Sequence, residues 1–370
     1  MAAVKIALHL YYDKEIERML ETKMSMPNYR ARFDRDRYEF WKQIEMKAVG
    51  KLPSLPNCLS TKVFKFIRAF DREIMEWVRD HQCLLRLSFI GCYYTCKSIL
   101  CWKADGTIEK MQTAKKLVQD RNFNLETRFA VACTYFLEDE VLAFWHGDKE
   151  VHIRSIARNR TNAAVRFWIK RLQRKHWRKK SWNVMVNSQL KNPSFRRSDI
   201  KLRVSSFFQY LSWEGKKNYF LYLRENSGHR DDYRLCMQVM DETERMELIS
   251  EYPGRILCLC LDWPFQSLFI DMASQLCSHM TPMEFEVILM HLIFHFLLPG
   301  LDVFDYAGLF KEFWHQSPTA FKETMKKNMR LFNVIDLVLN YDEKSTSLSL
   351  PETINESVRQ LVTAVTGNCA

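Results

Sequence analysis

The chain has 370 residues, of which 47% are hydrophobic and 27% charged, so it can bury a core and is not an intrinsically disordered protein. Only 10 residues are glycine, which argues against all-β folds and phosphate-binding α/β folds, because both need glycine in tight turns. The net charge of +11 excludes an acidic protein and raises the question of where the positive charge lies.

Neither a secretion signal nor a membrane span is predicted. Met1–Leu10 contains too short an apolar run for a signal peptide, and charges follow from Asp13 onwards. The longest apolar run, Val287–Leu298, is well short of the ~20 residues that cross a bilayer. Eleven cysteines without the spacing of a disulfide framework indicate reduced thiols. We therefore expect an intracellular protein, in the cytoplasm or the nucleus.

Polar residues that can cap helices recur along the chain and predict the helices in order. Such a residue accepts a hydrogen bond from one of the unpaired backbone N–H groups of the first helical turn. The caps predict helices over 108–121 after Thr107, over 125–145 after Asn124, from Asp241 to Tyr252, from the capping box Thr281–Glu284 to Leu298, and from Ser317 to about Asn340.

Short polar joints separate these segments, which makes consecutive helices neighbours and mostly antiparallel. One joint is Leu261–Phe265, a predicted turn with its aromatic residues packed across it and Pro264 opening the next helix. Segments 129–145 and 285–298 are apolar on most faces, so we expect them in the interior. The predicted fold is all-α, with antiparallel helix pairs in a solenoid-like or multilayer helical array.

No strict repeat period is visible in the sequence. Helix pairs recur at roughly 35–40 residues, which suits either a degenerate solenoid or compact helical domains. Composition divides the chain into an N-terminal helical region (1–146), a basic helical segment (147–200), a C-terminal helical array (201–340), and a polar linker with a terminal helix (341–370).

Two segments carry a resemblance to a known family. Residues 113–145, beginning Thr–Ala–Lys–Lys–Leu–Val–Gln–Asp–Arg–Asn–Phe, and 250–278, with Leu–Asp–Trp–Pro–Phe–Gln–Ser–Leu–Phe, resemble a lineage-expanded family of arthropod helical proteins that is loosely ankyrin-like in its helix pairing. The pattern covers about two-thirds of the chain, and its motifs are core residues. The resemblance implies a helical array and no known activity, so it assigns no functional residue.

All of the net charge lies in residues 151–198, a stretch without Asp or Glu. It holds 14 Lys and Arg, and since the whole chain carries +11, the remaining residues carry −3. On a helix, Arg166, Lys170, Arg174 and Arg178 form an i, i+4 ladder. The candidate contacts to an anion or a nucleic acid are Arg166, Lys170, Arg174, Lys175, Trp177, Arg178, Lys179 and Lys180.

The opposite side of that helix is predicted to face the core. Its apolar stripe comprises Ala164, Val165, Trp168, Ile169 and Leu172. Phe167 and Trp177 are expected to project beside the ladder. Like charges at i, i+4 repel, so we expect an acidic group to cover the ladder. Acidic patches of the chain itself at 138–140 and 231–232, another protein, or a phosphate backbone are the alternatives.

Other constellations that can carry chemistry are weak. His291 and His295 lie at i, i+4, a zinc-chelating spacing, but position 292 is Leu, so the glutamate of the zinc-protease motif is missing. Cys92 and Cys96 would share a helix face as buried thiols. No phosphate-binding loop, dinucleotide fingerprint or nucleophile elbow occurs in the sequence. We predict no catalytic residue, metal site or cofactor.

Three functions are compatible with the sequence. The first is a non-enzymatic protein-interaction scaffold, favoured because helices pair without catalytic motifs. The second is binding of a nucleic acid or anionic surface through residues 154–180. The third is an enzyme of unrecognised class. The sequence does not predict the oligomeric state.

Overall fold

The computed structural model describes residues 2–24, 35–52, 55–146, 162–173, 180–191, 203–225, 230–300, 304–342, 349–355 and 357–358. Within them, every named element is a helix, and the β-structure noted there is the isolated antiparallel bridge between Trp102 and Ile108. The all-α fold is therefore confirmed for the described residues.

The first half of the chain contains α1 (Ala2–Tyr11), α2 (Lys14–Met24), α3 (Arg35–Gly50), α4 (Asn57–Leu85), α5 (Phe89–Cys96), α6 (Lys110–Gln119), α7 (Leu125–Thr134), α8 (Glu138–His146), α10 (Ala163–Gln173) and α12 (Trp182–Leu190). The second half contains η1 (Ser205–Tyr210), α14 (Trp213–Glu225), α15 (Arg230–Val239), α16 (Glu242–Glu251), α17 (Pro253–Cys260), η2 (Gln266–Leu268), α18 (Phe269–Leu276), η3 (Cys277–His279), α19 (Pro282–Leu292), the π-helix η4 (Ile293–Leu297), α20 (Tyr306–Gln316), α21 (Thr319–Lys327) and α22 (Met329–Asn340).

Contacts group the described residues into two compact units. Unit 1 draws on Met1–Phe70, Ala104–Gly106 and Ile249–Ala370, and unit 2 on Asp71–Lys103 and Thr107–Leu248. The predicted segments are continuous in sequence, whereas each unit joins separate parts of the chain. The predicted boundaries after 146 and 200 fall within unit 2, and the boundary after 340 falls within unit 1.

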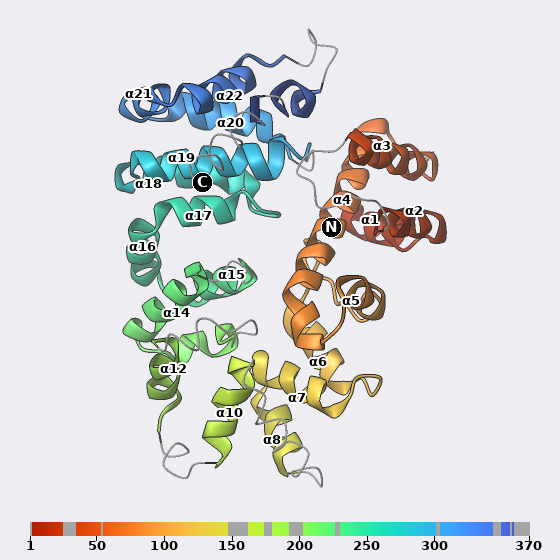
Figure 1. Ribbon diagram of the computed structural model, residues 1–370, viewed down its shortest axis with the longest axis vertical. Coiled ribbons are helices and arrows are strands. Elements are labelled where there is room, and N and C mark those ends of the chain that lie inside the picture. The colour runs from red at the N-terminus through yellow and green to blue at the C-terminus, as the bar shows by residue number, and fades with distance from the viewer. Residues whose placement is uncertain are drawn as a thin grey trace, which may run out of the picture. The chain divides into compact units, whose positions relative to one another are not determined.

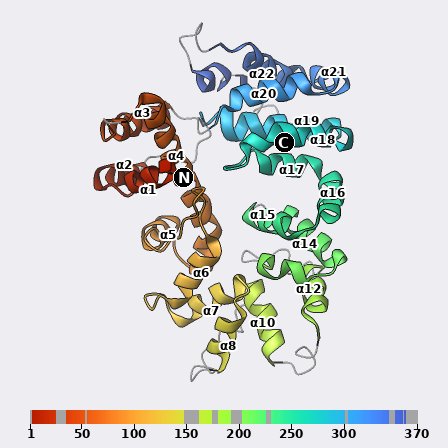
Figure 2. The same cartoon turned by 180° about the vertical axis from the view of Figure 1, so that it is seen from behind.

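In unit 1, helices two apart in the chain pack against each other. α17 packs on α19 and α19 on α21, while α18 packs on α20 and α20 on α22. Figures 1 and 2 show α17 to α22 lying side by side from both directions. Their core contains Phe269, Phe285 and Phe313, with the Phe313 ring centroid 5.1 Å from each of the other two. Edge-to-face and tilted aromatic contacts of this kind add to the burial of apolar area.

In unit 2, α7 is the central helix of its neighbourhood, because it contacts α6, α8 and α10. A second group comprises α12 against α14, α14 against α15, and α15 against η1. Aromatic rings around Phe136 fill the space between α10, α12 and η1, with Trp168 and Trp182 at 4.8 and 4.9 Å between ring centroids. This aromatic cluster forms a large part of the core of unit 2.

Three predicted helix starts are confirmed. The side chain of Asn124 accepts a hydrogen bond from Thr127 N at 2.8 Å, and Asp241 accepts one from Glu244 N at 2.8 Å. At Thr281 both halves of the capping box are present. These caps connect residues three apart, so they depend little on the rest of the fold.

The predicted helix over 125–145 is wrong as a continuous element, because it is broken between α7 and α8. The backbone at Phe136 has a φ of 56°, in the left-handed region. Leu137 N donates to Ala132 O at 2.9 Å and Phe136 N to Cys133 O at 3.4 Å. These two bonds make a Schellman motif, which ends a helix by turning the chain at a residue with positive φ.

Other boundaries also differ from the predictions. α6 begins at Lys110 after Glu109, so Thr107 is not its cap. The segment predicted as one helix from Ser317 to Asn340 is two helices, because Asn328 accepts a hydrogen bond from Leu331 N and starts α22. The turn at Leu261–Phe265 is present, but Pro264 does not open a helix, since η2 begins at Gln266.

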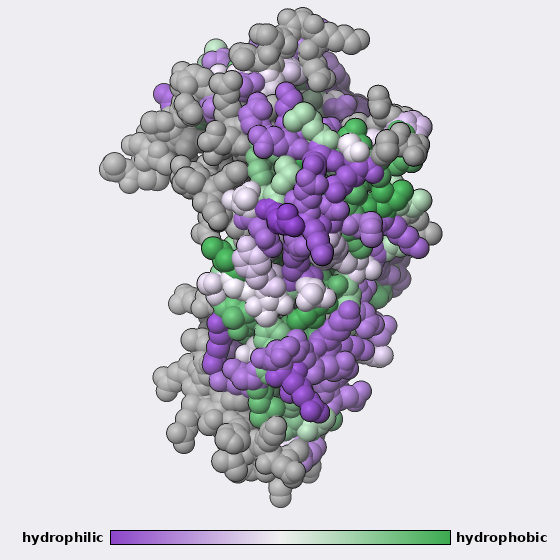
Figure 3. Space-filling view, turned by 90° about the vertical axis from the view of Figure 1, so that its right-hand side faces the viewer, coloured by the Kyte–Doolittle hydropathy of each residue, from purple (hydrophilic) through white to green (hydrophobic). Residues whose placement is uncertain are grey.

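Hydrophilic residues cover most of the described surface on the face shown in Figure 3, and hydrophobic residues form smaller patches between them. None of the described helices has the length and apolarity needed to span a bilayer.

Candidate functional site

The basic ladder predicted from the sequence is only partly visible. Arg166 and Lys170 lie half-buried on α10, and Lys180 is exposed just before α12. Arg174, Lys175, Trp177, Arg178 and Lys179 lie outside the described residues. The predicted core side of α10 is confirmed, because the five residues of its apolar stripe are all buried.

Phe167 was expected beside the ladder, and that prediction is wrong. Its ring is fully buried in unit 2, 6.2 Å from Trp168 and Trp182 between ring centroids. The helical wheel underestimated the width of the buried face, because α10 packs on α7 while the aromatic cluster covers its flank. Arg166 forms no side-chain hydrogen bond or ion pair with a described residue, and partial burial lowers its pKa. Binding of a nucleic acid by this segment stays a prediction.

The helix α19 exposes some apolar side chains, although segment 285–298 was expected in the interior and most of it is buried. Its buried face carries Phe285, Ile288, Leu289 and Leu292, whereas Val287 is 54% exposed and Met283, one turn earlier in α19, is 74% exposed. These two residues line a shallow, open groove of about 430 Å³ along α19 and η4, together with Glu286, Met290, His291, Phe294 and His295.

The two histidines of this groove lie on one side of the helix. The ring centroids of His291 and His295 are 4.4 Å apart, and the helix changes from α to π between them. Such π-helical turns often occur at functional sites. Within the described residues, no group of three or more His, Cys, Asp or Glu is arranged to hold a metal ion. Cys92 and Cys96 are buried in α5, as the sequence predicted.

Unit 2 contains a buried ionic cluster that the sequence did not predict. The Arg203 side chain is 3% exposed, and its Nη2 donates to Asp80 Oδ2 at 3.2 Å. Lys110 Nζ lies 3.9 Å from the same oxygen. Burial raises the pKa of the Asp80 carboxyl, although the neighbouring charges of Lys110 and Arg203 act against that shift. Arg203 and Asp80 are 123 positions apart, so no local pattern indicates their pairing.

His81 and Tyr135 form a hydrogen-bonded pair next to this cluster. His81 Nδ1 lies 2.6 Å from Trp77 O, and since a carbonyl oxygen only accepts, Nδ1 carries the proton. His81 Nε2 therefore accepts a hydrogen bond from the Tyr135 hydroxyl. Burial holds the pKa of His81 well below its usual range, and burial raises the pKa of Tyr135 to about 12. Both side chains are therefore neutral at neutral pH.

The buried neutral state of His81 predicts a pH-dependent stability. Its pKa is lower in the folded chain than in the unfolded chain, where it is near 6.5, so below that pH the unfolded chain binds the extra proton. We expect His81 to remove up to about 1.4 kcal/mol of unfolding free energy per unit of pH below this value. Urea unfolding between pH 7 and about pH 5 should show this slope in the native chain and lose it in His81→Gln.

Exposed His315 provides the control for that experiment, because His315→Gln removes an imidazole from the surface of α20. An identical pH slope in the native chain and the His81→Gln variant would contradict the assignment of a buried neutral histidine.

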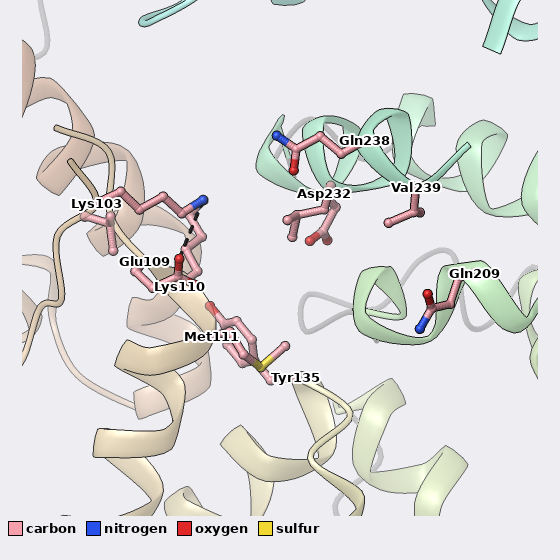
Figure 4. A pocket seen from close by; sticks show the side chains of 11 residues that line it. Lys103, Glu109, Lys110, Met111, Tyr135, Gln209, Asp232, Gln238 and Val239 are labelled. Atoms are coloured by element: carbon pink, nitrogen blue, oxygen red, sulfur yellow. Dashed lines mark ion pairs between the residues drawn. The ribbon is translucent and has the colours of Figure 1, made fainter. Parts of the chain in front are cut away.

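A cavity of about 300 Å³ lies beside the pair in unit 2. Lys103, Glu109 and Lys110 lie on one wall, Asp232 and Gln238 of α15 on the opposite wall, and Tyr135 below them (Figure 4). Its remaining lining residues are Ile108, Met111, Gln209, Leu235 and Val239. Tyr135 reaches the cavity because α7 ends at Thr134, at the Schellman turn.

Sequence reasoning missed this cavity and assigned Asp232 only to an acidic surface patch. That assignment is wrong, because Asp232 is buried and its Oδ2 accepts a hydrogen bond from the Tyr219 hydroxyl at 3.2 Å. Tyr219 in turn accepts one from Val204 N at 3.1 Å. Asp232 and Tyr219 come from different helices, so their contact leaves no local pattern in the sequence. The one local signal was Asp232 itself, a polar residue on an otherwise apolar face of α15.

Comparison of the chain with protein-family models, with curated proteins and with solved structures finds no match. The resemblance to an arthropod helical family therefore stays a prediction.

Proposed function

We propose that this chain is a protein-binding scaffold of helical-repeat type, and that unit 1 binds an amphipathic α-helix of another protein in the α19 groove. The observation that carries the proposal is the exposed apolar stripe of α19. Met283 and Val287 are exposed and Met290 is half-buried, and the three follow each other at i, i+4 and i+7, the spacing of one helix face.

The packing within unit 1 supports a helix as the occupant. α17, α19 and α21 pack in one series and α18, α20 and α22 in another, and such packing is what a solenoid built from helix pairs would require. In such an array each apolar helix face is covered by another helix. The stripe on α19 extends about 10 Å along the helix axis, at 1.5 Å per residue, which matches about two turns of a partner helix.

The side chains of the groove also indicate which residue types the partner helix should present. Methionine side chains at two of the three stripe positions adapt to different apolar shapes, as at other helix-binding surfaces. Glu286 is the acidic residue among those that line the groove. A partner helix with an apolar stripe and a basic residue beside it would therefore complement the groove.

The test is to select helical peptides from a displayed library against the full chain and to measure their binding to variants. Met283→Glu and Val287→Glu should each weaken binding by about tenfold or more, because they place an unpaired charge in a desolvated contact. Met329→Glu is the matched control, since Met329 is 65% exposed on α22 of the same unit but lies outside the groove.

Methyl NMR of the methionines gives a second readout. The Met283 and Met290 signals should shift when the selected peptide is added, and the Met329 signal should not. Peptides that bind the Met283→Glu variant as tightly as the native chain would contradict the proposal. Self-association that Met283→Glu abolishes would assign the groove to a second copy of the chain instead.

A further inference from the structure

The cavity of unit 2 has features of a ligand site that are independent of the α19 groove. Its volume of about 300 Å³ lies at the lower end of the range for small-molecule pockets. Charged side chains from α6 and α15 converge on it beside apolar ones, and groups with shifted pKa values lie directly behind it. This combination is typical of a binding site and is uncommon in a packed helical core.

Both signs of charge line the cavity. The side chains of Lys103 and Glu109 are 41% and 34% exposed and pair at 3.8 Å, so they lie at its solvent side. Lys110, 14% exposed, and buried Asp232 lie deeper. In Figure 4 Asp232 of α15 and Lys110 lie on opposite walls of the cavity. A purely anionic ligand would meet Asp232, and a purely cationic one would meet Lys110 with Arg203 behind it.

The surroundings hold these two charges in place. The Tyr219 hydroxyl donates to Asp232, and Asp80 lies between Lys110 and Arg203. α6 begins at Lys110, and Glu109 before it makes no side-chain capping bond. The start of a helix carries a partial positive charge, which adds to that of Lys110. This wall therefore suits a carboxylate, and the opposite wall suits an ammonium group.

The rest of the lining defines the remainder of the ligand. Ile108, Met111, Leu235 and Val239 present apolar surface. The Tyr135 hydroxyl donates to His81, which leaves its oxygen able to accept a hydrogen bond from the ligand.

We propose that the cavity binds a small zwitterion of the α-amino-acid class with an apolar side chain, with its ammonium on Asp232 and its carboxylate on Lys110. This site lies in unit 2 and goes beyond the binding of a partner helix by unit 1. Either proposal can fail while the other holds, because their tests change residues in different units.

The first experiment uses the native full chain and ligands of known structure. Isothermal titration with L-leucine, L-valine and L-methionine should show saturable binding of at least one. The carboxylic acid that lacks the amine and the amine that lacks the carboxylate should each bind about tenfold more weakly or not at all, because each loses one charge-assisted hydrogen bond. L-aspartate should also bind more weakly, because its second carboxylate meets the apolar wall.

Variants then test the two charged residues. Asp232→Asn keeps the shape and can still accept the bond from Tyr219, and Lys110→Met keeps the length of the side chain. Both should weaken binding by about tenfold or more. Lys116→Met on the exposed side of α6 and Asp139→Asn at the exposed start of α8 are the matched controls, with folding checked by circular dichroism.

Three results would overturn the proposal. The first is no saturable binding of any of the three amino acids at millimolar concentration. The second is binding of the singly charged analogues as tight as that of the amino acids, which would show that the two walls do not bind groups of opposite charge. The third is unchanged affinity in a folded Asp232→Asn variant, which places the ligand elsewhere.

Discussion

Replacement of Arg203 by Met is expected to lower the free energy of unfolding by about 3–5 kcal/mol, because it leaves the Asp80 carboxylate buried with one partner fewer. The guanidinium donates to Asp80 at 3.2 Å and lies 5.0 Å from the centroid of the Tyr135 ring, so both contacts are lost. Urea unfolding followed by circular dichroism measures the effect.

The double variant Asp80→Leu with Arg203→Met distinguishes a lost ion pair from lost packing. Removal of both charges should recover at least half of the stability lost in the single variant, because no uncompensated charge stays buried. A double variant as unstable as the single one would contradict the proposed cause.

The pH dependence of Arg203→Met gives an independent check. The folded-state pKa of Asp80 is raised, so as the pH falls the folded chain takes up a proton on Asp80 before the unfolded chain does, and folding is favoured. Without Arg203 the pKa of Asp80 should rise further. The stability deficit of Arg203→Met should therefore be smaller near pH 5 than near pH 8. A deficit that does not depend on pH would exclude the ionised carboxylate as its origin.

Replacement of Phe136 by Ala is expected to destabilise unit 2 by about 3–5 kcal/mol, the usual effect of removing a buried phenylalanine ring. The ring lies within 6.0 Å, between centroids, of Phe167, Trp168, Trp182 and Phe207. These contacts hold the residue at a φ of 56°, which costs an L-residue about 1–2 kcal/mol.

Phe136→Gly distinguishes the effect of backbone strain from the effect of losing the aromatic ring. Glycine loses the same aromatic contacts but adopts a positive φ without the Cβ clash, so this variant should be about 1 kcal/mol more stable than Phe136→Ala. Thermal and urea unfolding of both variants measure the difference. Exposed Tyr210→Ala, at the edge of the same aromatic cluster, is the control and should change stability by about 0.5 kcal/mol or less. If Phe136→Ala were as stable as Phe136→Gly or more stable, the proposed backbone strain at this turn would be contradicted.

The sequence by itself determined the helical class and several helix starts. Scarce glycine and abundant helix formers left little alternative to an all-α fold. Asn124, Asp241 and Thr281 cap helices as predicted, because each cap bonds to a backbone N–H three residues away. The core side of α10 was predictable for the same reason, since helical periodicity alone assigns Val165, Trp168 and Leu172 to one face.

Only the tertiary structure decided where helices break and which apolar faces are covered. The turn at Phe136 lacks the usual glycine and depends on aromatic rings from α10, α12 and η1, so no local pattern indicates it. Segment 285–298 is apolar on most faces, and hydrophobicity alone does not distinguish the face buried in unit 1 from Val287, which stays exposed beside Met283.

The sequence alone does not predict the cavity of unit 2, for a related reason. Its charged residues come from helices far apart in the chain, and each is ordinary in its own segment. A candidate site arises because three side chains converge on one cavity and are partly withdrawn from water together with Asp80 and Arg203. These three are Lys110, Tyr135 and Asp232. Convergence and burial are properties of long-range packing, whereas capping and periodicity are properties of neighbouring residues.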